Sequence, residues 1–278
     1  MCIRDSSWDS RHETAVGGLL EWSTFRSTAT PVDENGWASG LYANHVWYPT
    51  RGAAISLGGR WEHLERWGDS LTWRATGSWQ TPVEGIRMHG SYGTGFRAPS
   101  YFELFGSIPA FNFTGNPDLE AERSRGWDLG AEWQLPGDLT LDVTWFQNRI
   151  KDLIDFSPVN IGRANTEGLE VSAKGTLFGD RLAWRGSYTW LQATDETTGL
   201  RLVRRARHRA SLDLQGEPME GMLAGVGATY IAGVVDNDFS SFPSVRKSLD
   251  GILLVRAYCL YCLRERVSLQ GRVESLLG

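Results

Sequence analysis

The sequence contains no long hydrophobic run. A helix that crosses a membrane needs about 20 consecutive apolar residues, and no segment of the 278-residue chain approaches that length, so helical membrane spans are excluded. Strands of a membrane barrel escape this test because every second residue of such a strand is polar. A mean hydropathy of −0.31 and the lack of long apolar runs therefore argue against a helical membrane protein, but they leave a membrane β-barrel open.

Cysteine, histidine and net positive charge are also scarce. The three cysteines cannot make a disulfide framework, and Cys259 and Cys262 would point to opposite faces of an expected strand. The five histidines stand beside no recognisable hydrolase or zinc-protease motif, which argues against an enzyme. The net charge of −5 argues against nucleic acid as a partner. We expect no catalytic residue, no cofactor and no bound metal.

Tryptophan and glycine are abundant, with 13 and 32 residues. Around the turn at Pro136–Asp138, apolar residues alternate strictly with polar ones over Trp127–Leu135 and Leu139–Trp145. Two runs of period two joined by a tight turn predict an antiparallel hairpin with one apolar and one polar face.

This unit recurs along the chain, and no amphipathic helix of ordinary length interrupts it. The alternation predicts about thirteen strands: Ala15–Phe25, Trp37–Tyr48, Ala53–Glu62, Ser70–Gln80, Ile86–Phe96, Arg125–Leu135, Leu139–Phe156, Thr166–Leu177, Arg181–Ala193, Arg207–Gln215, Met222–Val235, Ser248–Leu263 and Arg266–Leu276. The chain is therefore expected to be all-β.

The connections between these strands alternate in length. Short turns are followed by mostly longer loops, at Arg26–Gly36, Arg97–Ser124, Ser157–Asn165, Thr194–Ala206 and Asp236–Lys247. Short turns at one rim and long loops at the other are typical of an up-and-down outer-membrane barrel, whose long loops face outside.

The composition of the two faces indicates which one meets lipid. A small soluble barrel would place the apolar face inside, but it needs about eight strands rather than thirteen. The polar face is heavily charged, whereas the apolar face is rich in Trp, Leu, Val, Ala and Gly. We therefore expect a transmembrane antiparallel β-barrel with a wet interior; a β-propeller or stacked soluble sheets are the alternative.

Both ends of the sequence bear on this barrel. Met1–Ser6 (MCIRDS) looks like a translated sequencing adapter, so we expect it to be non-native and the barrel domain to span 7–278. Bacterial single-chain barrels have even strand numbers, and no closing strand follows the last one. The chain is therefore expected to be part of a larger barrel.

Several boxes of the sequence resemble those of the TonB-dependent outer-membrane receptor family. Gly93–Ser100 (GTGFRAPS), followed by Glu103–Gly106, is similar to the FRAP box. Gly115–Glu122 (GNPDLEAE) is similar to the GNPxLxPE segment, with Ala121 in place of Pro. The others are Trp145–Ile154, Asn165–Glu170 and Arg272–Leu277, in which Ser275 replaces Asn.

The resemblance extends to one ligand class within this family. Leu202–Arg207 (LVRRAR) and Asp236–Pro243 (DNDFSSFP) resemble segments of cobalamin (vitamin B12) receptors. The resemblance implies a partial barrel, with about 13 of roughly 22 strands present and the plug domain absent. It also implies energised uptake through a TonB complex that the plug contacts. The ligand would be cobalamin or, alternatively, a ferric siderophore; an open outer-membrane porin is a further alternative.

Candidate ligand contacts lie in the long loops. We expect Tyr101, Phe105, Phe111, Phe113, Asp236 and Phe239 to contact the ligand. The alternative is that the aromatic residues pack against their own loop and that the run from Arg204 to Arg209 pairs with neighbouring acids. A haem receptor is disfavoured because no histidine lies between His89 and His208 to ligate iron.

Overall fold

The computed structural model describes residues 2–27, 32–109, 113–155, 158–179, 181–238, 240, 243–264 and 267–274. Fourteen of the strands in these ranges form one antiparallel up-and-down sheet. In order across the sheet they are β1 (Cys2–Asp9), β2 (His12–Ser27), β3 (Val32–Thr50), β4 (Ala53–Leu64), β5 (Gly68–Gln80), β6 (Ile86–Arg97), β9 (Glu122–Leu135), β10 (Leu139–Ile154), β11 (Asn160–Leu177), β12 (Leu182–Asp195), β13 (His208–Met219), β14 (Met222–Ala232), β17 (Ile252–Arg264) and β18 (Val267–Glu274).

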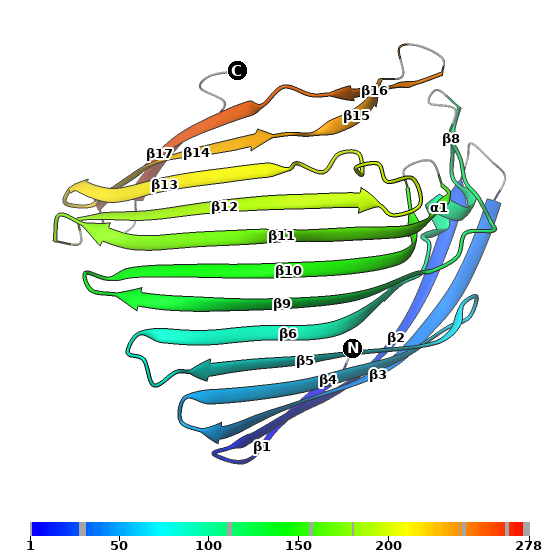
Figure 1. Ribbon diagram of the computed structural model, residues 1–278, viewed down its shortest axis with the longest axis horizontal. Helices are drawn as coiled ribbons and strands as arrows, with labels where there is room; N and C mark the ends of the chain where they lie inside the picture. The colour runs from blue at the N-terminus through cyan, green and yellow to red at the C-terminus, as the bar shows by residue number, and fades with distance from the viewer. Residues whose placement is uncertain are drawn as a thin grey trace.

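The sheet curves into a trough, with a concave and a convex face (Figure 1). Its short turns lie at one end of the strands, at the left of Figure 1. The other end, which we call the long-loop rim, carries the short link 65–67 and the longer connections, that is, the described residues of 98–121, 155–159, 196–207 and 233–251. Within the described ranges β1 and β18 are the two outer strands and do not pair with each other, so the sheet is an open part of a barrel.

A short helix and two small hairpins lie in the connections of the long-loop rim. Helix α1 (Tyr101–Phe105) and the hairpin of β7 (Ser107–Ile108) and β8 (Phe113–Thr114) belong to the connection between β6 and β9. The hairpin of β15 (Val235–Asp238) and β16 (Val245–Ser248) belongs to the connection between β14 and β17. No helix among the described residues is long and apolar enough to cross a membrane.

All thirteen predicted strands are present, and the prediction of an all-β antiparallel sheet is confirmed. The fourteenth strand, β1, contains most of the segment that the sequence analysis set aside, and it pairs with β2 from Cys2↔Gly18 onward. That Met1–Ser6 is non-native stays a prediction.

Two predicted long loops were wrong in length. Strand β2 continues to Ser27 and β3 begins at Val32, where a loop over Arg26–Gly36 was expected. Strand β11 begins at Asn160, inside the expected loop Ser157–Asn165. Both strand ends project beyond the apolar band and carry polar residues on both faces, so alternation could not reveal them.

The convex face carries the apolar side chains. Trp22, Leu41 and Leu71 are 66%, 63% and 71% exposed. Aromatic residues form two belts on this face. The belt nearer the long-loop rim, here called the upper aromatic belt, comprises Trp61, Trp73, Tyr92, Trp127, Trp145 and Trp190; Trp47, Trp79, Trp133 and Trp184 lie nearer the short turns. An apolar band between two aromatic girdles is the lipid-facing surface of an outer-membrane barrel.

Polar side chains converge on the concave face. The ring of His89 on β6 reaches Asp142 on β10 at 2.8 Å (Nε2–Oδ2), passing over Gly130 of the intervening strand β9. In the same way Tyr258 on β17 donates to Gln215 on β13 at 2.7 Å across β14. Side chains two strands apart meet more readily where the sheet bends toward them, so these pairs agree with the polar face being the inner one.

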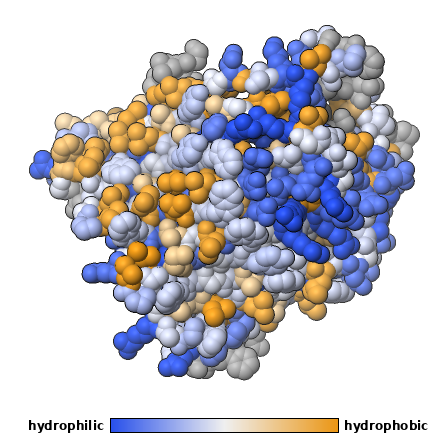
Figure 2. All heavy atoms as spheres, viewed as in Figure 1, coloured by the Kyte–Doolittle hydropathy of each residue, from blue (hydrophilic) through white to orange (hydrophobic). Residues whose placement is uncertain are grey.

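In the part of the sheet that the structure describes, no apolar core lies between the aromatic belts. The seven buried hydrophobic residues among the described ones all lie at the long-loop rim: Leu104, Phe113, Leu119, Ile154, Ala164, Ala193 and Leu202. On the surface the pattern is different: in Figure 2 hydrophilic residues gather at the right, toward the long-loop rim, and hydrophobic residues spread over the left and central strands. The rim is thus the packed part of the molecule outside the lipid.

Candidate ligand-binding rim

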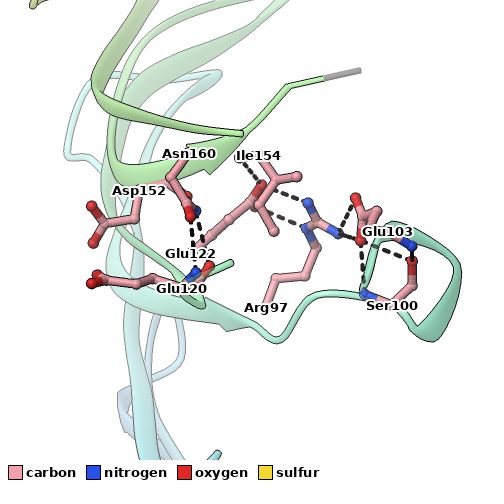
Figure 3. Close-up of polar contacts among 8 residues, drawn as sticks. All are labelled: Arg97, Ser100, Glu103, Glu120, Glu122, Asp152, Ile154 and Asn160. Carbon is pink, nitrogen blue, oxygen red and sulfur yellow. Dashed lines mark hydrogen bonds and ion pairs between the residues drawn. The ribbon is translucent and has the colours of Figure 1, made fainter. Parts of the chain in front are cut away.

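An arginine at the end of β6 anchors the connection 98–121. Arg97 donates from Nη2 and Nε to the two carboxylate oxygens of Glu122, at 2.6 and 2.9 Å, and from Nη1 to Glu103 at 3.0 Å (Figure 3). Glu122 also accepts the backbone N–H of Ile154 at 2.8 Å. One guanidinium therefore ties β6, α1 and β9 together, and its carboxylate partner extends the tie to β10.

Helix α1 begins with a reciprocal cap. The Ser100 hydroxyl accepts the backbone N–H of Glu103, and the Glu103 carboxylate accepts the backbone N–H of Ser100 at 2.7 Å. Partial burial raises the pKa of Glu103, but hydrogen bonds from Arg97 and Ser100 lower it more, so its pKa lies below the ordinary value. The carboxylate is therefore ionised at neutral pH and bound on two sides.

The returning half of the connection is fixed by two asparagines. The Asn160 amide accepts the backbone N–H of Glu120 at 2.8 Å and donates to the backbone oxygens of Glu120 and Asp152 (Figure 3). Asn116 donates to the backbone oxygen of Pro158 at 3.1 Å. The segment 115–122 is thereby held against the turn between β10 and β11.

The predicted aromatic contacts separate into different environments. Phe113 is 9% exposed and stacks on Phe102, with ring centroids 5.0 Å apart. Phe105 packs against the buried cluster that includes Leu104, and the Arg66 guanidinium lies 5.1 Å from its ring centroid. Both rings thus contact their own loop. Phe111 lies outside the described residues.

Tyr101 reaches across to the neighbouring strands. Its ring stacks on Phe25 of β2 with centroids 6.3 Å apart, and its hydroxyl occupies the space that a Cβ on Gly36 would need. Burial, together with the negative charges of Glu65 and Glu34, raises the pKa of Tyr101. The hydroxyl is therefore protonated at neutral pH.

A pocket of about 270 Å³ lies beside Tyr101, bordered by α1 and the rim ends of β2, β3 and β4. Its charged lining comprises Glu21, Glu34, Glu62, Glu65 and Arg66, and Trp37 and Trp67 supply apolar wall. Glu62 is paired with Arg60. The other three carboxylates against one guanidinium give this acidic pocket a negative potential, which suits a neutral or cationic group. The acidic residues were missed in the sequence because they come from three separate strands and a turn.

The opposite part of the rim is basic. Arg204 donates from Nε to both carboxylate oxygens of Asp236 at 3.0 Å, and this bond lowers the pKa of Asp236. Burial, with Arg207 and Arg246 nearby, lowers the pKa of Arg201. Asp236, a predicted ligand contact, is thus paired with arginine, while Phe239 lies outside the described residues.

Among the described residues no group of three or more His, Cys, Asp or Glu side chains is arranged to hold a metal ion. The described part of the rim offers aromatic surface, an acidic pocket and a basic region.

These features define the class of protein. An up-and-down antiparallel sheet with a lipid-facing apolar band, a polar concave face and long loops at one rim is the wall of an outer-membrane β-barrel. The sequence also matches the family model described as TonB dependent receptor-like, beta-barrel, over residues 4–273. The chain belongs to the TonB-dependent receptor family, whose β-barrels are transporters of the bacterial outer membrane and not enzymes.

Solved structures share this fold. The ferric enterobactin receptor PfeA of Pseudomonas aeruginosa superposes with a TM-score of 0.80 at 17% identity, over 99% of this chain and 48% of that one. The siderophore receptor PirA of Pseudomonas aeruginosa gives 0.75 at 19% identity, over 95% and 48%. The copper transporter OprC gives 0.74 at 14% identity, over 99% and 49%. The chain thus spans about half the length of these neighbours.

Proposed function

We propose that this chain forms the ligand-capturing side of a receptor that takes up a large, scarce solute by TonB-dependent transport, without chemistry on the solute. The observation that carries the proposal is the anchored connection 98–121, which places α1 and its acidic pocket at the rim of the polar concave face. Family membership supplies the energised mechanism, and the plug and TonB contact it implies are part of the proposal.

Cobalamin is the first candidate ligand. The two segments that resemble cobalamin receptors lie in separate loops, and Arg204 of one bonds Asp236 of the other. The rim also carries an acidic pocket and a basic region. Cobalamin combines a cationic cobalt centre with an anionic phosphodiester, so both regions could contribute.

A ferric siderophore is the second candidate. It is favoured by PfeA and PirA, the ferric enterobactin and siderophore receptors with the same fold. A tris-catecholate iron complex carries several negative charges, and the excess of carboxylates in the acidic pocket would repel it. Such a ligand would have to bind on the basic side of the rim.

Ligand contacts follow from the positions of the side chains. Tyr101 borders the acidic pocket and is the strongest candidate. Asp236 could contact ligand while paired with Arg204. Phe105 and Phe113 would act by shaping the loop, and Phe111 and Phe239 remain proposed contacts.

The test is a titration of the full-length protein in detergent with cobalamin and with ferric siderophores. Tyr101→Ala should weaken binding about tenfold, the loss of roughly 1.4 kcal/mol of contact, while Tyr101→Phe should bind within about threefold of wild type. Cobalamin binding that survives removal of 98–121 would take this loop out of the site. Solute passage that persists in cells lacking TonB would instead favour an open porin.

A further inference from the structure

Five cationic side chains lie together on the convex face at the long-loop ends of β9, β10 and β11. They are Arg123, Arg125, Arg149, Lys151 and Arg163, here called the basic patch. All five are exposed. In the register of the sheet Arg125 is opposite Arg149, and Lys151 is opposite both Arg123 and Arg163. Figure 2 shows hydrophilic residues gathered over this end of the strands.

The direction of these side chains follows from the alternation of the strands. Arg123 and Arg125 share the parity of Trp127 on β9, and Arg149 and Lys151 share that of Trp145 on β10. No bulge interrupts the pairing of β9 and β10 over this stretch. The basic patch therefore faces the same side as the lipid-facing tryptophans, away from the concave face and its cargo.

The basic patch lacks the acidic partners that would explain it as a set of surface ion pairs. Among the described residues none of the four arginines forms an ion pair, and Lys151 alone contacts a carboxylate, that of Asp152 at 3.5 Å. Like charges directly opposite each other on a sheet are destabilising. Three like-charged pairs on one face indicate an anionic partner whose charge offsets their repulsion.

The height of the basic patch identifies the layer that it meets. Successive residues on one face of a strand are about 7 Å apart, so Arg125 stands one step and Arg123 two steps beyond Trp127 of the upper aromatic belt. Aromatic girdles mark the boundary between hydrocarbon and headgroups, and long loops mark the outer side. The basic patch consequently lies at the level of the outer-leaflet headgroups.

A groove of about 540 Å³ continues from the basic patch onto β5 and β6. All five cations line it together with a single acid, Glu196, and Leu71, Trp73 and Phe96 supply an apolar wall. Arg123 also lies over the Phe96 ring, 5.8 Å from its centroid. A surface with cations above and exposed apolar side chains below is complementary to an amphiphile with an anionic headgroup.

We propose that the basic patch binds the phosphate groups of a lipid headgroup in the outer leaflet, with the acyl chains lying along Leu71 and Trp73. Arginine is suited to phosphate because its planar fork donates two parallel hydrogen bonds. The site is separate from the proposed cargo site, since it lies on the other face of the sheet.

The experiment uses the full-length protein in detergent, titrated with lipid A carrying its phosphates and with the same lipid after enzymatic removal of the phosphates. Wild-type protein should prefer the phosphorylated lipid. The double variant Arg125→Gln and Arg149→Gln should lose about 25-fold in affinity, since each cation near an anionic surface contributes about fivefold. The matched control removes two exposed cations at the short turns, Arg51→Gln and Arg181→Gln, and should bind as wild type.

Three results would overturn the proposal. One is equal binding of the phosphorylated and dephosphorylated lipids, and another is equal loss of affinity in the double variant and its control. The third is displacement of the lipid by inorganic phosphate at equal molar concentration, which would assign the basic patch to a soluble anion. Cargo binding measured on the same samples should not change, which separates this result from that of the proposed function.

Discussion

Replacing Arg97 with alanine should release the connection 98–121 from the sheet. The change leaves Glu122 and Glu103, whose side chains are 13% and 23% exposed, without their cation. Hydrogen bonds to charged groups contribute about 1.5–3 kcal/mol each. Because the Arg97 side chain is itself 45% exposed, we take the lower end for its two partners and expect a local cost of about 3 kcal/mol.

Hydrogen exchange of α1 measures this local opening directly. The amides of Leu104 and Gly106 donate within the turn, at 3.1 and 2.8 Å, and are protected only while α1 stays folded. A cost of about 3 kcal/mol corresponds to an exchange rate about 100-fold faster. Arg97→Lys should give an intermediate rate because it keeps the charge and loses the fork, and Arg125→Ala on the convex face should change nothing. An increase below about threefold for Arg97→Ala would refute the anchoring role.

The same amides should respond to pH. Since the folded-state pKa of Glu103 lies below its ordinary value of 4.5, its stabilisation of α1 is complete above pH 4.5 and is lost as the pH falls through the folded-state pKa. Protection of Leu104 should therefore decrease only in the acid range below 4.5. In Arg97→Ala the cation that lowers the pKa of Glu103 is gone, so its folded-state pKa moves back toward the ordinary value and the acid-dependent loss of protection should be smaller.

Three further predictions concern the faces of the sheet and its packed rim. Trp145→Arg places a charge in the lipid-facing band at a cost of about 2–4 kcal/mol and should block membrane assembly, measured by heat-modifiable migration on a gel. Thr144→Arg on the polar face should still assemble, and the reverse result would invert the assignment of the two faces. Gly130→Ala puts a Cβ against the Thr144 hydroxyl and the His89 ring, so it should lower the free energy of unfolding in urea by about 1–3 kcal/mol. The control Gly77→Ala, whose Cβ would meet nothing within 4 Å, should lie within about 1 kcal/mol of wild type in the same titration, the usual cost of an ordinary substitution. Phe113→Ala should cost about 3 kcal/mol of local stability, read as faster exchange of the β7–β8 hairpin, and unchanged exchange would place this ring outside the packed loop.

The strands were predictable because their signal is local. Each strand from β2 to β18 in the main sheet carries its own alternation, so neighbours in the sequence were sufficient to find it. The polar ends of β3 and β11 were missed for the same reason, since beyond the apolar band nothing forces the two faces to differ. The order of the strands in the sheet was also predictable, because each connection joins two strands that are neighbours in both the sequence and the sheet.

The site was less predictable because its contacts join distant parts of the sequence. Arg97 and Glu122 stand 25 residues apart, and both fall in boxes that the resemblance singled out. The resemblance therefore marked the right residues, although it did not say that they bond each other. The acidic pocket needed the fold, because Glu34 and Glu65 reach Tyr101 only after three strands and α1 are in place.

The contacts that span one strand on the concave face have a consequence for anything that moves along it. Asp213 bonds Arg256 over Gly227, and His89 bonds Asp142 over Gly130, so these charges and dipoles are occupied by each other. Under the proposed function, a solute that moves along this face meets paired side chains lying over glycine at both of these positions. Pairs of this kind keep the proposed passage polar while leaving fewer free charges to bind the solute tightly, as its release would require.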